Sequence, residues 1–322
     1  MVVFQAVALL DVVRDGVLES QHTGHVVVCD VDGDIVAHLG DAELPTYVRS
    51  AAKPFQALAT LDLLDEADVA LDVNGLAIAC ASHDGTAIHQ IEAARLLAEA
   101  GLDETALQCP PALPTDMPTL LAQREPQSLA HNCSGKHASF LLAHCATGGD
   151  PADYLHQQSA LQRRIYERLA EATAATPTGP GIDGCGAPAW VLPLRGLATG
   201  FARLAAGHTP EYSRIRSAMT SRPSLIGGDD AFDTQMMRAS NRVVAKRGAE
   251  AVLAAGLEGE RALGIAVKIA DGGKRADGPV LAAILEGLGA LVPPPVRYPV
   301  VLGGGRPHGA LEVRSEVTAL LG

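Results

Sequence analysis

The sequence is short of lysine, and that shortage makes each lysine informative. Only five of its 25 basic residues are lysines, at positions 53, 136, 246, 268 and 274, so arginine supplies most of the positive charge. Arginine stays protonated in proteins, whereas a desolvated lysine can become neutral. A lysine kept in such a chain is a candidate for chemistry that needs a neutral amine, although Lys246 and Lys274 are expected to be ordinary exposed lysines.

Charge and hydropathy exclude two classes of partner. The formal net charge is −12, which argues against nucleic acid because phosphate contacts require basic patches. The longest apolar stretch, residues 280–292, is interrupted by Glu286 and is too short to span a bilayer, so no membrane partner is expected. Residues 1–16 lack the positive n-region and small-residue cleavage site of a signal peptide. A cytoplasmic protein is therefore expected.

Aromatic residues make up only 3% of the chain, so the core must be mostly aliphatic. The six cysteines are not expected to form a disulfide framework in an intracellular chain. Three of them lie in apolar runs and read as small core residues. Cys133 and Cys185 differ, because each lies in a polar motif that contains glycine.

The hydrophobic pattern predicts strands near both ends of the chain and helices between them. Residues 25–40 predict two strands joined around Asp32 and Gly33, preceded by a strand at residues 4–13. Residues 50–67 predict a helix that begins near Ser50, because Pro54 is tolerated only in a first turn. The segment 75–85 fits a strand or a helix equally well.

Later segments continue this alternation of helices and strands. Helices are expected at 86–101, 133–149, 151–175 and 278–291, and one running from residue 234 toward Lys246; a strand is expected at 262–271 and a closing hairpin at 299–314. We expect a single domain over residues 1–322 of the α/β class, an α+β sandwich in which a mixed sheet from both chain ends carries helical layers.

Ser50 and Lys53 form an S-x-x-K motif at the predicted helix start. The helix start gives the serine hydroxyl a partly positive setting that favours a developing alkoxide or oxyanion. A lysine one turn further on can take the hydroxyl proton if its amine is neutral, which burial or nearby positive charge favours. The structural alternative is a helix-capping serine followed by a lysine whose amine extends to solvent.

Two further segments carry candidate groups. Ser82, His83 and Asp84 are adjacent, so their side chains diverge and they cannot form a triad; a helix-ending turn is the alternative. Lys268 lies in an apolar strand, so its amine is either buried as a structural group or at the edge of a cleft.

Cys133 and His137 are four residues apart on a predicted helix, and Cys185 could join them as a third ligand. Three such ligands suit Zn²⁺ with one open position. The chain has no C-x-x-C pair, and two free cysteines in turns remain the alternative.

Six segments taken in order resemble the rhizobial-type, or class 3, L-asparaginases of the asparaginase II family. They are YVRSAAKPFQ (47–56), ACASHDG (79–85), HNCSGKHASFLLA (131–143), GIDGCGAPAW (181–190), RPSLIGG (222–228) and AVKIADG (266–272), and the resemblance runs over about residues 4–300. It implies a fold like those of serine β-lactamases and serine-dependent glutaminases, hydrolysis of L-asparagine to L-aspartate and ammonia, and a homodimer. The last strands, around residues 301–314, depart from the family pattern.

The resemblance also assigns residues. It implies two Ser–Lys tandems, Ser50 with Lys53 and Ser82 with Lys268, and a substrate pocket lined by Arg49, His137 and Asp183. It implies one Zn²⁺ per chain, held by Cys133, Lys136 and Cys185, so that lysine replaces histidine as the third ligand; we expect this metal to position the substrate. In this reading Ser50 attacks the amide, Lys53 accepts its proton, and Ser82 and Lys268 relay protons.

Two other functions remain open from the sequence. The S-x-x-K motif and the implied fold also suit a penicillin-recognising acyl-transferase or hydrolase, which nitrocefin turnover would reveal. A zinc-stabilised binding protein without catalytic activity is the non-enzymatic alternative.

Overall fold

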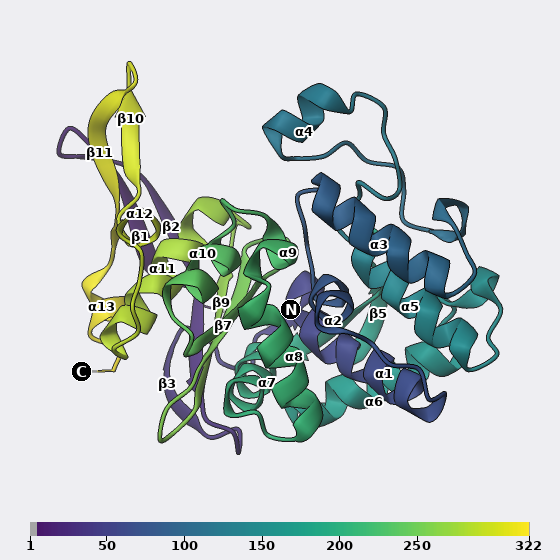
Figure 1. Cartoon of the computed structure of the whole chain (residues 1–322). Coiled ribbons are helices and arrows are strands. Elements are labelled where there is room, and N and C mark those ends of the chain that lie inside the picture. The colour runs from purple at the N-terminus through teal and green to yellow at the C-terminus, as the bar shows by residue number, and fades with distance from the viewer. Residues whose placement is uncertain (1–4, 322) are drawn as a thin grey trace.

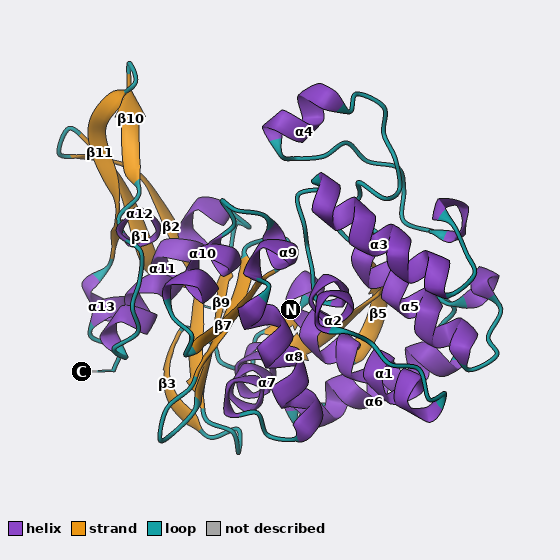
Figure 2. Ribbon diagram, viewed as in Figure 1, coloured by secondary structure: helices purple, strands orange, loops and turns teal. Residues whose placement is uncertain are grey.

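The computed structural model describes residues 5–321. Residues 1–4 lie outside this range, and with them the first residue of the predicted strand 4–13 and the start of residues 1–16, which lack the features of a signal peptide. Within the described range, a large sheet stands beside a group of helices (Figures 1 and 2).

The large sheet has eight strands, and every pairing in it is antiparallel. Its order is β10-β11-β1-β2-β9-β8-β7, with β3 paired to β2. The α/β class is confirmed, but the sheet is not mixed, because short turns join most neighbouring strands and such turns connect antiparallel partners. The strands are β1 (Val7–Arg14), β2 (Val17–Cys29), β3 (Ile35–Leu39), β7 (Val243–Arg247), β8 (Val252–Leu257), β9 (Leu263–Ile269), β10 (Val300–Gly303) and β11 (Arg306–Val313).

A small sheet of three strands lies among the helices. Its order is β4-β6-β5, made from β4 (Pro45–Tyr47), β5 (Thr178–Ile182) and β6 (Pro188–Pro193). The helices are α1 (Lys53–Glu66), α2 (Val73–Ala79), α3 (Ala87–Glu99), α4 (Met117–Ala122), α5 (Ser134–Ala146), α6 (Ala160–Thr173), α7 (Leu194–Ala206), α8 (Pro210–Ser221), α9 (Pro223–Gly227), α10 (Phe232–Ala239), α11 (Lys274–Gly287), α12 (Pro294–Arg297) and α13 (Ser315–Thr318), and the 3₁₀ turns are η1 (Arg49–Ala52), η2 (Glu104–Ala106) and η3 (Pro151–Asp153).

The large sheet is covered on both faces, which explains why its central strands read as continuous apolar runs. In β2, Val27 belongs to the core cluster shared with the helical part, whereas Val26 and Val28 belong to the cluster shared with α11. This is the alternation expected of a strand. Helix α7 approaches β8 and β9 closely because Gly256 and Gly264 have no side chain; a Cβ at either position would overlap a carbonyl oxygen of α7.

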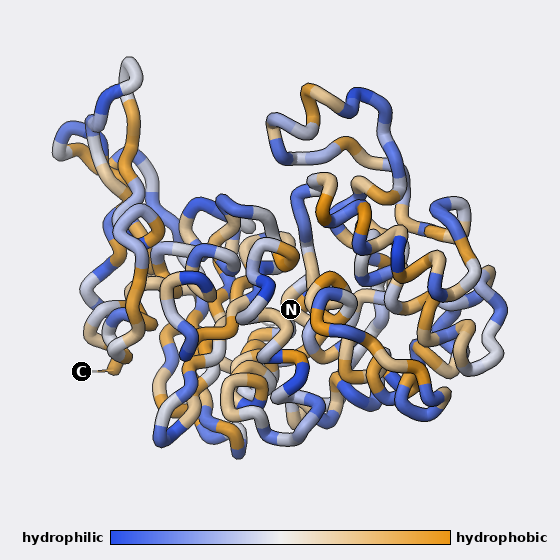
Figure 3. The backbone as a smooth tube through the Cα atoms, viewed as in Figure 1, coloured by the Kyte–Doolittle hydropathy of each residue, from blue (hydrophilic) through white to orange (hydrophobic). Residues whose placement is uncertain are grey.

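Hydrophobic stretches run through the strands and the inner helices, and most turns are hydrophilic (Figure 3). Helix α1 is buried along most of its length and packs against α5 and α6. Among residues 5–321, no helix is both long and apolar enough to cross a membrane.

Most predicted elements are confirmed by the structure, including the closing hairpin β10–β11. The ambiguous segment 75–85 forms the end of α2 followed by a loop. The helix predicted to run toward Lys246 is wrong: α10 ends at Ala239, and Lys246 lies in β7. The run Val243–Ala245 is buried between neighbours, and β-branched residues there favour a strand.

Candidate functional site

Ser50 lies in the 3₁₀ turn η1, which leads from β4 into α1. Arg49 begins this turn with a left-handed φ of 46°. The N-cap residues of η1 and α1 are Val48 and Ala52, and neither helix start has a side-chain cap. The alternative of a helix-capping serine is therefore wrong, and the Ser50 hydroxyl is not committed to the helix.

Lys53 is buried, with 1% of its surface exposed, so the alternative of an amine extending to solvent is also wrong. Its Nζ donates to Ser82 Oγ at 2.9 Å, to Cys133 Sγ at 3.2 Å and to the carbonyl oxygen of Ala81. The hydroxyl that contacts the Lys53 amine is thus that of Ser82. Lys53 therefore contacts both groups of candidate residues, the serines through Ser82 and the cysteines through Cys133.

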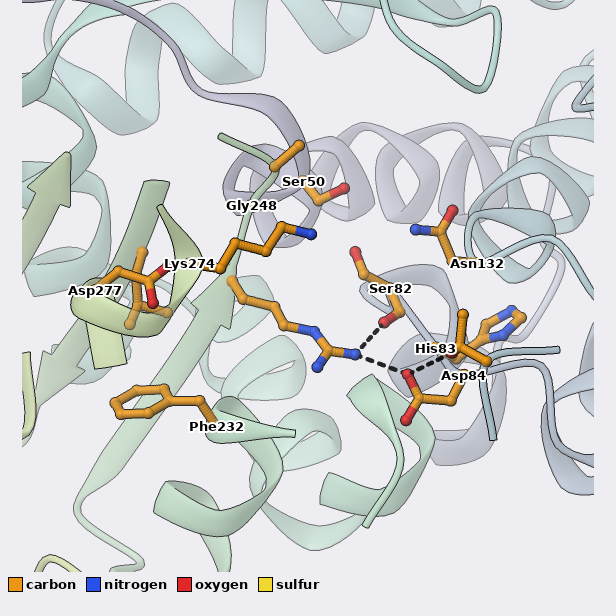
Figure 4. A pocket seen from close by; sticks show the side chains of 13 residues that line it. Ser50, Ser82, His83, Asp84, Asn132, Phe232, Gly248, Lys274 and Asp277 are labelled. Carbon is orange, nitrogen blue, oxygen red and sulfur yellow. Dashed lines mark hydrogen bonds and ion pairs between the residues drawn. The ribbon is translucent and has the colours of Figure 1, made fainter. Parts of the chain in front are cut away.

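A hollow of about 380 Å³ lies beside both serines (Figure 4). Ser82 is buried on its wall, held by its backbone N–H, which donates to the Ile226 carbonyl oxygen at 2.8 Å. Ser50 is half-buried and also lines a second, narrow hollow. The 380 Å³ hollow is lined by Ser50, Ser82, His83, Asp84, Thr115, Asn132, Phe232, Arg247, Gly248, Ala249, Leu253, Lys274 and Asp277.

Arg247, at the end of β7, braces the loop that carries Ser82. Its Nη2 donates to the carbonyl oxygens of Ser82 and Gly227, each at 3.0 Å, and to Asp84 Oδ1 at 3.1 Å. Figure 4 shows the contacts to Ser82 and Asp84 as dashed lines. The arginine therefore fixes the serine by its backbone and leaves the Ser82 hydroxyl to Lys53.

The divergence of Ser82, His83 and Asp84 is confirmed. The His83 ring lies within hydrogen-bond distance of Ser134 Oγ at 3.0 Å and stacks on His89, away from both serines. Burial lowers the pKa of His83 well below its ordinary value, so the ring is neutral. These residues form no catalytic triad.

Lys274 and Asp277 line the same hollow from the start of α11, and the sequence reading missed both. Lys274 is exposed as expected, yet its side chain extends toward the space between Ser50 and Ser82 (Figure 4). Burial raises the pKa of Asp277 to about 7. Their position just after the Asp271-Gly272 turn, at the end of a strand that carries a candidate lysine, was the signal that could have identified them.

The second hollow contains the Arg49–Asp183 pair that the family resemblance implies. Arg49 Nε and Nη2 donate to Asp183 Oδ1 at 3.1 and 2.7 Å. Burial alone would raise the pKa of Asp183, but Arg49 holds it below its ordinary value. Ser50, Lys53 and Lys136 line this hollow as well, so one of the serines and the lysine of the cysteine cluster border the same space.

Cys133, Lys136 and Cys185 meet where the start of α5 faces the turn between β5 and β6. Lys136 Nζ lies 3.3 Å from Cys185 Sγ, and both groups are buried. A hydrogen bond with Cys185, together with Lys53 and Lys136, holds the pKa of Cys133 well below its ordinary value although burial opposes this. The two thiols and the amine of Lys136 therefore lie together as three potential ligand atoms for a metal ion.

His137, the ligand favoured by spacing alone, points toward another partner. Its Nδ1 lies 2.6 Å from the Tyr154 hydroxyl, and burial lowers its pKa to about 4. The side chain is fully buried and lines neither hollow beside the serines, contrary to its expected place in the substrate pocket.

The cysteine cluster fits a metal ion only with the lysine amine as a ligand. Among residues 5–321, no three His, Cys, Asp or Glu side chains form a group that could hold a metal. Two thiols and a buried amine are nevertheless a donor set that Zn²⁺ accepts once all three are deprotonated. His137, on the same helix, lies near enough to Cys185 for that side chain to oppose the effect of burial on the pKa of the ring.

Lys268 is not brought to Ser82. Its Nζ donates to the Glu250 carbonyl oxygen at 2.6 Å and to that of Ile269, and it lines a third hollow of about 480 Å³ together with Arg49. Burial lowers the pKa of Lys268. The expected Ser82–Lys268 tandem is absent from the described residues, because strand β9 directs this amine to the other side of Arg49.

Lys246 is not an exposed lysine, so that expectation is wrong. Its side chain is fully buried, with Nζ 3.4 Å from Asp233 Oδ2 and donating to the Arg247 carbonyl oxygen at 2.9 Å. Burial lowers the pKa of Lys246 to about 7, although Asp233 favours the charged form. Its place in β7, where residues 243–246 are all buried, is the physical reason.

Comparisons with known proteins give one family and several distant structures. No curated relative matches the sequence. Two structures of Mglu in its native form match with TM-scores of 0.44 and 0.34 and identities of 14% and 16%, the second in 4.3 M NaCl; each covers 76% of this chain. The chain spans 58% and 55% of the length of those two proteins.

The family model described as L-asparaginase II matches residues 10–309. This range includes both serines, the cysteine cluster, and the start of α11. It also includes most of the closing hairpin, the part that departed from the expected pattern. Because the match covers nearly the whole sequence, the chain belongs to the L-asparaginase II family.

Proposed function

We propose that the protein hydrolyses the side-chain amide of L-asparagine to L-aspartate and ammonia through a serine–lysine site. One observation carries this proposal: the buried Lys53 amine contacts the Ser82 hydroxyl at 2.9 Å, on the wall of a hollow that Ser50 also lines. An amine without a carboxylate partner and with a hydroxyl in contact is suited to proton transfer.

Ser50 is the better nucleophile of the two serines. It is half-buried and lines both hollows, whereas Ser82 is buried and already bonded to Lys53. Ser50 Oγ forms a bond with the amide carbon as its proton passes to the Lys53 amine, with Ser82 as the relay. The ammonium of Lys53 then protonates the leaving nitrogen, and ammonia departs.

Water completes the reaction by attacking the resulting ester. The Lys53 amine accepts a proton from the attacking water and returns it to Ser50 Oγ as the ester bond breaks, which releases L-aspartate and restores the serine hydroxyl. A relay through Lys268 would require that amine to leave its two carbonyl partners, so the proposal assigns the proton to Lys53.

We also propose a Zn²⁺ ion held by Cys133, Lys136 and Cys185. When bound, it would supply a Lewis-acid contact that positions a substrate oxygen near Arg49 and Asp183. Purified protein should contain about one zinc per chain by elemental analysis, and Cys133→Ser and Cys185→Ser should each reduce this at least about tenfold. A zinc content that does not change in either variant would place the metal elsewhere.

The fold family, the oligomeric state and the cellular location also remain proposals. The antiparallel sheet beside a helical part, with the S-x-x-K turn between them, supports a variant of the fold shared by serine β-lactamases and glutaminases. A homodimer and a cytoplasmic location follow only from the family resemblance and the sequence. Light scattering on purified protein would measure the assembly.

The decisive experiment measures ammonia release with L-asparagine and L-glutamine as separate substrates. Wild-type protein should release ammonia from L-asparagine, and Ser50→Ala should lower kcat by at least about 1,000-fold while the circular dichroism spectrum is unchanged. Hydroxylamine should trap the ester as the hydroxamate in wild type and not in Ser50→Ala. Trapping in Ser50→Ala but not in Ser82→Ala would exchange the roles of the serines, and no ammonia from either amide would refute the function.

A further inference from the structure

Four charged side chains line the 380 Å³ hollow, and two of them neutralise each other. Arg247 and Asp84 form an ion pair at 3.1 Å, and the arginine is further held by two carbonyl oxygens. Lys274 and Asp277 form no ion pair within the described part of the chain. The hollow therefore presents one uncommitted charge of each sign.

Asp277 is an unusual wall residue because only 9% of its surface is exposed. Its Oδ1 accepts a hydrogen bond at 2.7 Å from the backbone N–H of Gly278, and no described cation pairs with the carboxyl group. A buried carboxylate without an opposite charge is costly. A ligand that brings an ammonium group would remove this cost.

Lys274 complements Asp277 from one turn earlier on the same face of α11. Its side chain is exposed, so its amine can adjust its position, and it extends toward the space between the two serines (Figure 4). An ammonium in that position attracts a carboxylate, which it can hold as a point charge without a fixed geometry.

We propose that Lys274 and Asp277 bind the amino-acid end of the substrate, Lys274 the α-carboxylate and Asp277 the α-ammonium. This assignment rests on the proposed function, and it defines the substrate class as zwitterionic α-amino acids with a short side-chain amide. A zwitterion supplies one charge of each sign to the two uncommitted groups. Amides that lack either charge leave one of them unpaired and bind less well.

The test compares three ligands that differ by one charge. L-Asparagine has both groups, succinamic acid lacks the ammonium, and 3-aminopropanamide lacks the carboxylate. Asp277→Asn should raise KM at least about tenfold for L-asparagine and leave succinamic acid within about twofold. Lys274→Met should weaken the binding of L-asparagine and of succinamic acid but not the binding of 3-aminopropanamide. Lys274→Arg should restore part of the lost affinity. Where turnover of an analogue is too slow, its inhibition constant serves.

Arg275→Met is the matched control, because Arg275 lies next to Lys274 on the helix but contacts His22 and Ser20, outside the hollow. Its KM should equal that of wild type for all three ligands. Equal losses for all three ligands in Lys274→Met and Asp277→Asn, or no loss in either, would overturn the proposal.

Calorimetry with L-aspartate on the Ser50→Ala protein separates this proposal from the hydrolase assignment. L-Aspartate should bind that protein and bind at least about tenfold more weakly once Asp277→Asn is added. If the wild-type protein released no ammonia but L-aspartate still bound in this way, the hydrolase function would be refuted and the amino-acid site would stand. Normal ammonia release with unchanged binding in the charge variants would refute the amino-acid site alone.

Discussion

Lys53 and Lys246 are both buried in the core within electrostatic reach of each other, yet their surroundings differ. Lys53 contacts a hydroxyl, a thiol and a carbonyl oxygen. Lys246 lies opposite the carboxylate of Asp233, which is itself fully buried. Both lysines are buried, but Lys53 contacts groups that can donate or accept a proton, whereas Lys246 contacts a counter-ion.

The difference shows that the partner of a buried lysine, rather than its burial, indicates chemistry. A carboxylate compensates the charge in place and gives the amine a structural role. A hydroxyl offers a proton that the amine can accept, which is what nucleophile activation requires. Three measurements would break or sharpen this contrast.

The largest effect is expected at Lys53. Lys53→Arg should lower kcat/KM for L-asparagine about 100- to 10,000-fold, nearly as much as Lys53→Met, because arginine keeps the charge but cannot accept a proton near neutral pH. The measurement is steady-state ammonia release from pH 6 to about 10, with the thermal midpoint as a check on folding. Retention of more than about a tenth of the activity would make Lys53 an orienting cation and assign the base to another amine.

The second effect is on stability and concerns Lys246. Lys246→Met should cost about 3–5 kcal/mol of unfolding free energy, because it leaves the Asp233 carboxylate buried without its lysine partner. Lys246→Arg should also destabilise the protein, since a larger and permanently charged group must occupy a fully buried position. Urea unfolding measures both changes.

The double variant Lys246→Met/Asp233→Asn is the matched control for that pair. It should recover a large part of the lost stability, as removal of both charges leaves nothing uncompensated. Activity per folded molecule should stay within about tenfold of wild type in the double variant. A loss comparable to that of Lys53→Arg would erase the distinction between the two lysines.

The smallest effect extends the contrast to a carboxyl group without a counter-ion. Burial raises the pKa of Asp277 from 3.8 to about 7, although the Gly278 N–H and the charges of Lys274 and Arg247, neither of which forms an ion pair with it in the described residues, act to lower it. Between those pH values the folded state binds the proton more tightly than the unfolded state, so wild-type stability falls as pH rises from about 4 to 7. Asp277→Asn should therefore gain about 1–3 kcal/mol over wild type at pH 8 and nothing at pH 4.

Urea unfolding of both proteins at the two pH values measures this difference. The reverse order, with the gain at pH 4, or a gain that is independent of pH, would show that the Asp277 carboxyl is already compensated in the folded protein.

The sequence predicts the strands and helices well where local signals are strong. The Asp32-Gly33 turn, Pro54 in a first turn and the apolar spacing of residues 86–101 are all confirmed. It failed at Lys246, because the basic pair Lys246-Arg247 after a short apolar run resembles an exposed helix end, and the burial of Lys246 appears only once the strand is placed in the sheet.

The site was predictable as a set of residues but not as a set of pairs. The structure places Ser82 rather than Ser50 against Lys53, and it brings Lys136 to Cys185, as the family resemblance implied. Which hydroxyl meets which amine depends on the directions of strand β9 and the loop after α2, and neither is written in local spacing. Lys274 and Asp277 were missed because their role arises only where α11 meets the loop of Ser82.

The hairpin β10–β11 has a practical consequence for handling the protein. It lies at the opposite edge of the sheet from β7, which carries Arg247, and its tip extends away from the rest of the chain (Figure 1). At the tip, Gly304 and Gly305 have left-handed φ values of 55° and 76° and nothing within 4 Å of a Cβ built on either. A peptide tag or a linker to a solid support inserted there would leave the hollow beside the serines open, so the protein could be immobilised in a uniform orientation.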